Sequence, residues 1–74
     1  MSSAVAVFGL GKYQKSGILE LKKRKLFIVG FDENNNPHSK KIVDKFFNIS
    51  FSKINKIQKI CKKNKVKYLF AFST

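Results

Sequence analysis

AVAVFGLGKYQ, residues 4–14, is the stretch that decides the predicted fold. Its first five residues are apolar without polar alternation, which is typical of a strand covered on both faces, and such strands belong mainly to parallel sheets. Gly9 and Gly11 then allow a sharp turn and leave backbone N–H groups open to a ligand. We therefore expect the rest of the chain to pack around this strand.

Length and composition limit the class of protein. A chain of 74 residues, 43% hydrophobic and with eight phenylalanines, predicts one small folded domain spanning 1–74. A single cysteine excludes a disulfide framework and a thiolate metal cluster, and fits a reducing cytoplasm. No stretch approaches the roughly 20 apolar residues that span a bilayer, and no secretory signal is visible. We expect a cytoplasmic protein without a membrane partner.

The net charge of +12 is the most conspicuous number in the composition. It arises from 16 basic against 4 acidic residues and predicts attraction to nucleic acid. All the basic residues except Arg24 are lysines, however, and lysine gives general phosphate attraction without base recognition. The chain is also rich in asparagine and isoleucine, so the charge also fits a compositional bias. A small basic, ribosomal-type nucleic-acid-binding protein stays as an alternative.

Residues 13–25 allow two interpretations. Ile18 and Leu21 share a helical face, and basic residues gather where the last turn would be, which favours a helix. The alternative is a hairpin that pairs 18–21 with 26–31. Its turn at 22–25 has no Gly, Asn or Asp to supply a positive φ, so the helix is preferred.

A second buried strand is predicted at 26–31, LFIVGF, where again no polar residue interrupts the run. It leads to Asp32, 21 residues after Gly11, where a βαβ unit returns beside its first strand. A polar loop follows. Pro37 is then placed to open a short helix that ends near Asp44.

Residues 46–51, FFNISF, alternate in the manner of a half-buried edge strand. Ser50 or Ser52 is expected to cap the next helix by accepting a backbone N–H in its first turn. One side of the strand is predicted to carry Phe47, Ile49 and Phe51.

Residues 52–63 give the clearest helical pattern in the chain, since isoleucines recur at helical spacing with lysines opposite. Asn64 is a suitable C-terminal cap, and 66–72 reads as a final apolar strand. The element order β-α-β-α-β-α-β predicts a small Rossmann-like α/β domain with a parallel sheet in the order 3-2-1-4. The carboxyl ends of its strands would bring 9–14, Asp32 and Ser73 to one crevice.

With this order in view, residues 7–50 and 54–73 together resemble the N-terminal, pre-ATP-grasp domain of ATP-grasp enzymes such as biotin carboxylase, carbamoyl-phosphate synthetase and carboxylate-amine ligases. In that family a strand leads to Gly-x-Gly-x-x-Gln, then a helix, then a strand ending in an acid with an Asn-rich turn. A segment of the type Ala-Asp-x-Phe introduces the edge strand and reads VDKF at 43–46 here. A lysine-ending helix precedes the last strand and reads ICKK at 60–63.

The resemblance implies that the chain shapes the acceptor-substrate site of a carboxylate-amine or thiol ligase. In the family, ATP and magnesium lie between two further domains that this sequence lacks, so we expect no bound cofactor, no metal site and no catalytic residue in the chain alone. Its partners would be a small-molecule substrate and the remaining ligase domains, and the isolated domain is expected to be poorly stable or self-associating. The substrate-binding residues implied are Gly9, Gly11, Lys12, Gln14, Asp32 and Ser73.

The sequence also contains weaker patterns that could indicate other kinds of chemistry. Gly9-Leu10-Gly11 also begins a dinucleotide fingerprint, which keeps an NAD-binding oxidoreductase fragment as a second alternative, but Gln14 stands where the third glycine belongs. Asp32 is equally suited to cap the loop that follows it. Cys61 falls on an apolar helical face and His38 in a separate loop, which predicts a buried small hydrophobe and a surface residue rather than a catalytic pair.

Overall fold

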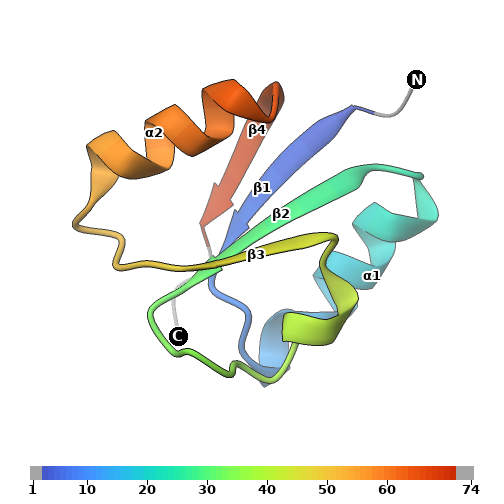
Figure 1. Ribbon diagram of the computed structural model, residues 1–74. Helices are drawn as coiled ribbons and strands as arrows, with labels where there is room; N and C mark the ends of the chain where they lie inside the picture. Colours follow the sequence, from blue (N-terminus) through green and yellow to red (C-terminus); the bar gives the residue numbers. More distant parts are fainter. Residues whose placement is uncertain (1–2, 72–74) are drawn as a thin grey trace.

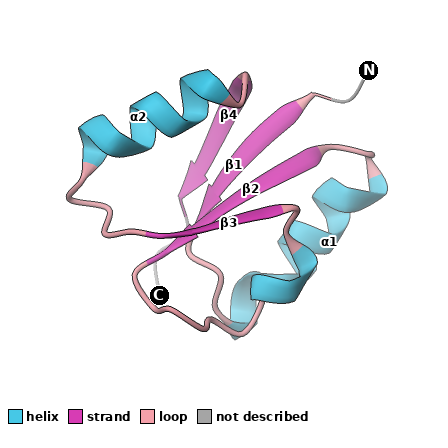
Figure 2. Ribbon diagram, viewed as in Figure 1, coloured by secondary structure: helices cyan, strands magenta, loops and turns pink. Residues whose placement is uncertain are grey.

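The computed structural model describes residues 3–71, which form a four-stranded parallel sheet in the order β3-β2-β1-β4 with helices on both faces (Figure 1). The predicted α/β class and strand order are confirmed. Strands and helices alternate along the chain, as Figure 2 shows. The elements are β1 Ala4–Phe8, α1 Lys15–Lys23, β2 Phe27–Asp32, β3 Lys45–Asn48, α2 Ile54–Lys63 and β4 Val66–Ala71, with 3-10 turns at Lys12–Gln14 and Lys40–Ile42.

The two central strands, β1 and β2, carry the core. They pair in parallel with Ala6 opposite Val29, and their alternate side chains enter two apolar clusters on opposite faces of the sheet. On one face α1 contributes Ile18, and on the other α2 contributes Ile57, both essentially inaccessible to solvent. The unbroken apolar runs therefore reflect burial on both faces, as predicted.

The helical interpretation of 13–25 is confirmed and the hairpin is wrong. A 3-10 turn runs directly into α1, and the chain reverses at Lys25, whose φ of 60° lies in the left-handed region. β2 then pairs with β1 in parallel rather than with residues 18–21. A hairpin would also have required a tight turn built from lysines and an arginine.

Of the short helix expected from Pro37 to Asp44, only a 3-10 helix at Lys40–Ile42 forms. The backbone of this segment bonds to other elements instead. The N–H of Ser39 donates to the carbonyl of Leu10 at 2.8 Å, and that of Asp44 donates to the carbonyl of Ile28 at 2.9 Å. The segment therefore lies along the central strand as a connector that closes one side of the sheet.

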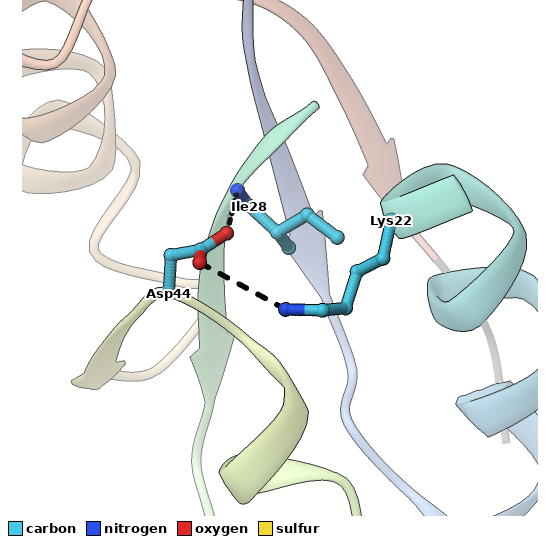
Figure 3. A network of polar contacts seen from close by, with 3 residues as sticks. All are labelled: Lys22, Ile28 and Asp44. Carbon is cyan, nitrogen blue, oxygen red and sulfur yellow. Dashed lines mark hydrogen bonds and ion pairs between the residues drawn. The ribbon is translucent and has the colours of Figure 1, made fainter. Parts of the chain in front are cut away.

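A polar contact fixes the point at which this connector meets β2 (Figure 3). The Asp44 Oδ2 accepts the backbone N–H of Ile28 at 2.7 Å, and its Oδ1 lies 3.8 Å from the Lys22 ammonium. The hydrogen bond satisfies a buried donor at the start of β2, beyond the reach of β3. Because the ion pair is partly exposed, we attribute the anchoring chiefly to the hydrogen bond.

β3 lies at the edge of the sheet, as predicted, but ends at Asn48 rather than Phe51. The Nδ2 of Asn48 donates to the carbonyls of Asp32 and Glu33 at 3.0 and 2.8 Å, and the N–H of Ile49 still donates to the Asp32 carbonyl at 3.0 Å. Phe51 lies beyond the strand, and its ring meets that of Phe8 edge-on at 4.7 Å.

The predicted serine cap of α2 is also wrong. The hydroxyls of Ser50 and Ser52 lie 2.9 Å apart, and that of Ser50 donates to Glu33 Oε1 at 2.8 Å. The N-cap residue is Lys53, whose side chain makes no capping hydrogen bond. The two serines therefore stabilise the turn before the helix.

The C-terminal part agrees with the predicted elements. Asn64 caps α2, its Nδ2 donating to the carbonyl of Ile60 at 2.8 Å. The last strand, Val66–Ala71, pairs in parallel with β1, while Phe72 lies outside the described residues. Neither helix within 3–71 has the length and apolar character needed to cross a membrane.

Candidate functional site at the carboxyl edge of the sheet

A glycine turn leaves the carboxyl end of β1. Gly9 adopts a φ of 103°, which favours glycine, and its N–H donates to the carbonyl of Phe31 at 2.9 Å. The next N–H, that of Leu10, donates to Asp32 Oδ2 at 2.8 Å. The turn is thus bound at two successive residues to the end of β2, and its position is fixed by the sheet.

Asp32 holds two loops together through its carboxylate. While Oδ2 accepts the Leu10 N–H, Oδ1 accepts the N–H of Asn34 at 2.8 Å and so shapes the polar loop after β2. Both oxygens are therefore engaged within the protein. This favours the capping interpretation of Asp32, although each oxygen retains lone-pair capacity for a further donor.

Ser39 makes a third contact that holds the glycine turn in place, and the sequence did not predict it. It is 2% exposed, its hydroxyl donates to the carbonyl of Gly11 at 3.0 Å, and its N–H bonds to Leu10. A serine in a polar loop carries no sequence signal for such a contact. The contact depends on the path of the segment at 37–44, which brings the Ser39 backbone alongside the turn.

Gln14 is buried and lies against the turn. A Cβ placed on Gly11 would lie 2.7 Å from Gln14 Oε1, so a side chain at this position would require the glutamine amide to shift. The glutamine side chain therefore lies against the position where a dinucleotide fingerprint keeps open backbone. This geometry counts against the NAD-binding alternative.

Lys12 and Tyr13, by contrast, are exposed, and the lysine ammonium lies 6.0 Å from the centre of the tyrosine ring. Within residues 3–71, no hydrogen bond is recorded from the backbone N–H groups of Gly11, Lys12 or Tyr13. These donors and the ammonium belong to the segment that follows the carboxyl end of β1. Together they offer positive potential to a carboxylate or a phosphate.

The structure brings the glycine turn and Asp32 together, as predicted, but their substrate-binding role remains a prediction. Ser73 lies outside the described residues, which reach Ala71, opposite Phe8 of β1. The connections after β1 and β3 run over opposite faces of the sheet, so β1 and β4 flank the switch point of the topology. In open parallel sheets, ligands bind outside the carboxyl ends of the strands at such a point.

The other reactive side chains of the described residues do not cluster into a second candidate site. Within 3–71, no three His, Cys, Asp or Glu side chains lie close enough to hold a metal ion. His38 is exposed, and Cys61 is half-buried among apolar neighbours, where burial raises the pKa of its thiol. Comparison of the sequence with protein-family models and with curated proteins finds no match.

Proposed function

We propose that this chain is the substrate-side domain of an ATP-grasp ligase and does not catalyse ligation by itself. The observation that carries the proposal is the glycine turn at the switch point of a 3-2-1-4 parallel sheet, fastened by Asp32 and Ser39. This combination supports the resemblance in the sequence, because element order and turn chemistry agree. The resemblance implies that ATP and its metal would be held by other domains, so we assign no step of ligation to this chain.

The proposed role of the turn is to hold a small carboxylate substrate. The fixed backbone donors of Gly11 and Lys12 would receive its oxygens, and the exposed Lys12 ammonium would add attraction. Asp32 and Ser39 are positioning residues, since they act on the turn through hydrogen bonds. A rigid turn limits the entropy lost when the substrate is ordered.

The test uses the complete product of the gene, assayed for ADP release with a panel of amino acids and other carboxylates. We expect Lys12→Ala to raise the KM of the carboxylate about tenfold, the loss of one charge-assisted hydrogen bond, while the KM of ATP stays unchanged. Lys59→Ala, which removes an exposed lysine from the far face of α2, is the matched control. Equal KM values for the two variants would contradict the assignment of the turn.

The 74-residue chain gives an independent test. By the proposal it hydrolyses no ATP, and NMR titration with carboxylates shifts the amides of 9–14 before any others. ATP hydrolysis by the chain alone, or NADH binding that moves the same amides, would contradict it. The Gln14 side chain is the physical reason to expect no such NADH binding.

The structure removes one argument for the nucleic-acid alternative. The hairpin that would present residues 22–25 as a basic tip does not form. Exposed lysines lie on both helices, which join apolar clusters on opposite faces of the sheet. Such a distribution predicts weak association with any polyanion. That association should fall steeply with salt and show no sequence preference.

A further inference from the structure

β4 is an edge strand whose side chains after Val66 are left exposed by the other described residues. Every residue from Lys67 to Ala71 is exposed, including Tyr68 at 65%, Leu69 at 42% and Phe70 at 40%. Only β1 pairs with β4, so the outward backbone groups of its other edge have no strand partner within residues 3–71. An apolar strand with a free edge is a template for another strand.

Apolar grooves flank β4 on both faces of the sheet. On the α1 face, Leu21 and Leu26 form a groove with Tyr68 and Phe70, and on the α2 face a second groove forms beside Leu69. A strand added to the free edge would direct alternate side chains to the two faces, one set toward each groove. A helix or a globular surface docked on one face would leave the other groove open. The second groove is lined further by Ile57, Cys61 and Val66.

The charges around these grooves are of one sign. Arg24 lines the α1-side groove, Lys62 the α2-side groove, and Lys67 both, while no acidic residue of the described part of the chain lines either one. From the free edge, the two grooves and this charge, we propose that β4 binds an extended apolar segment flanked by acidic residues. Its backbone adds a strand to the sheet, its alternate apolar side chains fill the grooves, and its carboxylates meet the three basic side chains.

A second copy of the chain and a nucleic acid are the competing occupants. Self-association is one of the two outcomes that the sequence predicts for the isolated domain, but pairing of two β4 strands would bring two chains of net charge +12 together, with Lys67 and its neighbours concentrated at the junction. A single strand of nucleic acid could stack bases on Tyr68 and Phe70, but it offers nothing for the aliphatic groove beside Leu69. An apolar strand flanked by acidic residues matches the free edge, both grooves and the three basic side chains.

The test measures binding of a fluorescent peptide of about seven residues, the length of a common strand, whose central residues are all valine or isoleucine, so that both faces are apolar, and which carries glutamates at both ends. A second peptide has lysines in place of the glutamates. At low ionic strength we expect the acidic peptide to bind the natural chain at least about tenfold more tightly, as expected from several exposed charge contacts. It should shift the amides of Val66–Ala71 and leave those of Lys45–Asn48 unchanged.

Charge-reversal variants sharpen the result. Lys67→Glu should remove most of the preference for the acidic peptide, whereas Lys59→Glu, the same change on the exposed face of α2, should keep it. Far-UV circular dichroism verifies that both variants fold. If Lys67→Glu fails to fold, the comparison of the two peptides on the natural chain still decides.

Three outcomes would overturn the proposal. Equal affinity for both peptides would remove the role of the charge. A free chain that sediments as a dimer with the β4 amides protected would assign the edge to a second copy. Displacement of the acidic peptide by single-stranded oligothymidine at physiological salt would assign it to nucleic acid.

Discussion

The two edge strands of the sheet differ in how far the other described residues cover their side chains. At one edge, β3 is four residues long, and its Phe46 and Phe47 each pack into one of the two apolar clusters. At the other edge, β4 is six residues long and exposed beyond Val66. Both strands are rich in aromatic residues, so composition does not make the difference. A strand is closed only where the connecting segments of the chain lie over it.

The connectors explain this asymmetry. The segment before β3 is tied to the centre of the sheet by Asp44 and Ser39, so it covers the β2 side of the α1 face. α2 buries Ile57 against the central strands and leaves the groove beside Leu69 open. Closing β4 would take a further segment, and the proposed acidic strand fills that place.

The largest effect should come from truncating one apolar side chain at each edge. Phe47→Ala should lower the free energy of unfolding by roughly 2–4 kcal/mol, because its ring packs 5.6 Å from that of Phe31 in the core. Leu69→Ala should change it by less than about 0.5 kcal/mol. Urea titration followed by circular dichroism measures both. Equal losses would mean that β4 is as well covered as β3.

The next effect concerns the closeness of the connector to β2. A Cβ on Gly30 would lie 2.9 Å from Leu10 Cδ1 and 3.0 Å from Val43 Cγ1, so Gly30→Ala should cost about 1–3 kcal/mol by overpacking. Gly17→Ala, at an exposed position inside α1, should instead stabilise by up to about 1 kcal/mol. Thermal melts of the pair measure both. Two changes of the same sign would contradict the tight packing at the β3 side.

The Asp44 anchor should matter through its hydrogen bond more than its charge. Asp44→Ala leaves the buried Ile28 N–H unpaired and should cost about 1–3 kcal/mol. Asp44→Asn keeps an oxygen acceptor and loses only the exposed pairing with Lys22, which is worth about 0–1 kcal/mol. Urea titration distinguishes the variants, and an alanine no worse than the asparagine would show that the anchor is dispensable.

The smallest effect is on the Cys61 thiol beside the open groove. Burial raises its pKa, so alkylation by iodoacetamide near neutral pH should be slower than that of a free cysteine, and should slow further when the acidic peptide covers the groove. Because the folded state holds the thiol proton more tightly, the protonated Cys61 contributes to the free energy of unfolding. This contribution is present below the ordinary thiol pKa and is lost as the pH rises through the pKa of Cys61 in the folded state. Mass spectrometry follows the rate. A rate that the peptide leaves unchanged would contradict docking over this groove.

The strand order was predictable because β1 and β2 are unbroken apolar runs and the helices have clear periodicity. The failures were local. Residues 37–44 form only a 3-10 helix, because their backbone makes hydrogen bonds to β2 and the glycine turn. Ser50 and Ser52 do not cap α2, because their hydroxyls make contacts in the turn that precedes it. The bonds of 37–44 and the bond from Ser50 to Glu33 join residues far apart in the chain, so no local pattern contains them.

The candidate site was predicted in outline and refined in its chemistry. The convergence of the glycine turn with Asp32 follows from parallel topology alone, whereas the part of Ser39 depends on where the connector runs. The exposure of β4 was not predictable either. An apolar run indicates a strand that needs cover, and only the placement of the helices tells whether the chain provides it.

Amide hydrogen exchange of the free chain, measured at several protein concentrations, tests the open edge most directly. We predict slow exchange in β1 and β2, and fast exchange at alternate residues of Val66–Ala71, whose outward N–H groups have no strand partner within the described residues. That pattern should not change with concentration. Uniform protection along β4 that grows with concentration would contradict it, because the edge would then already be paired with another copy.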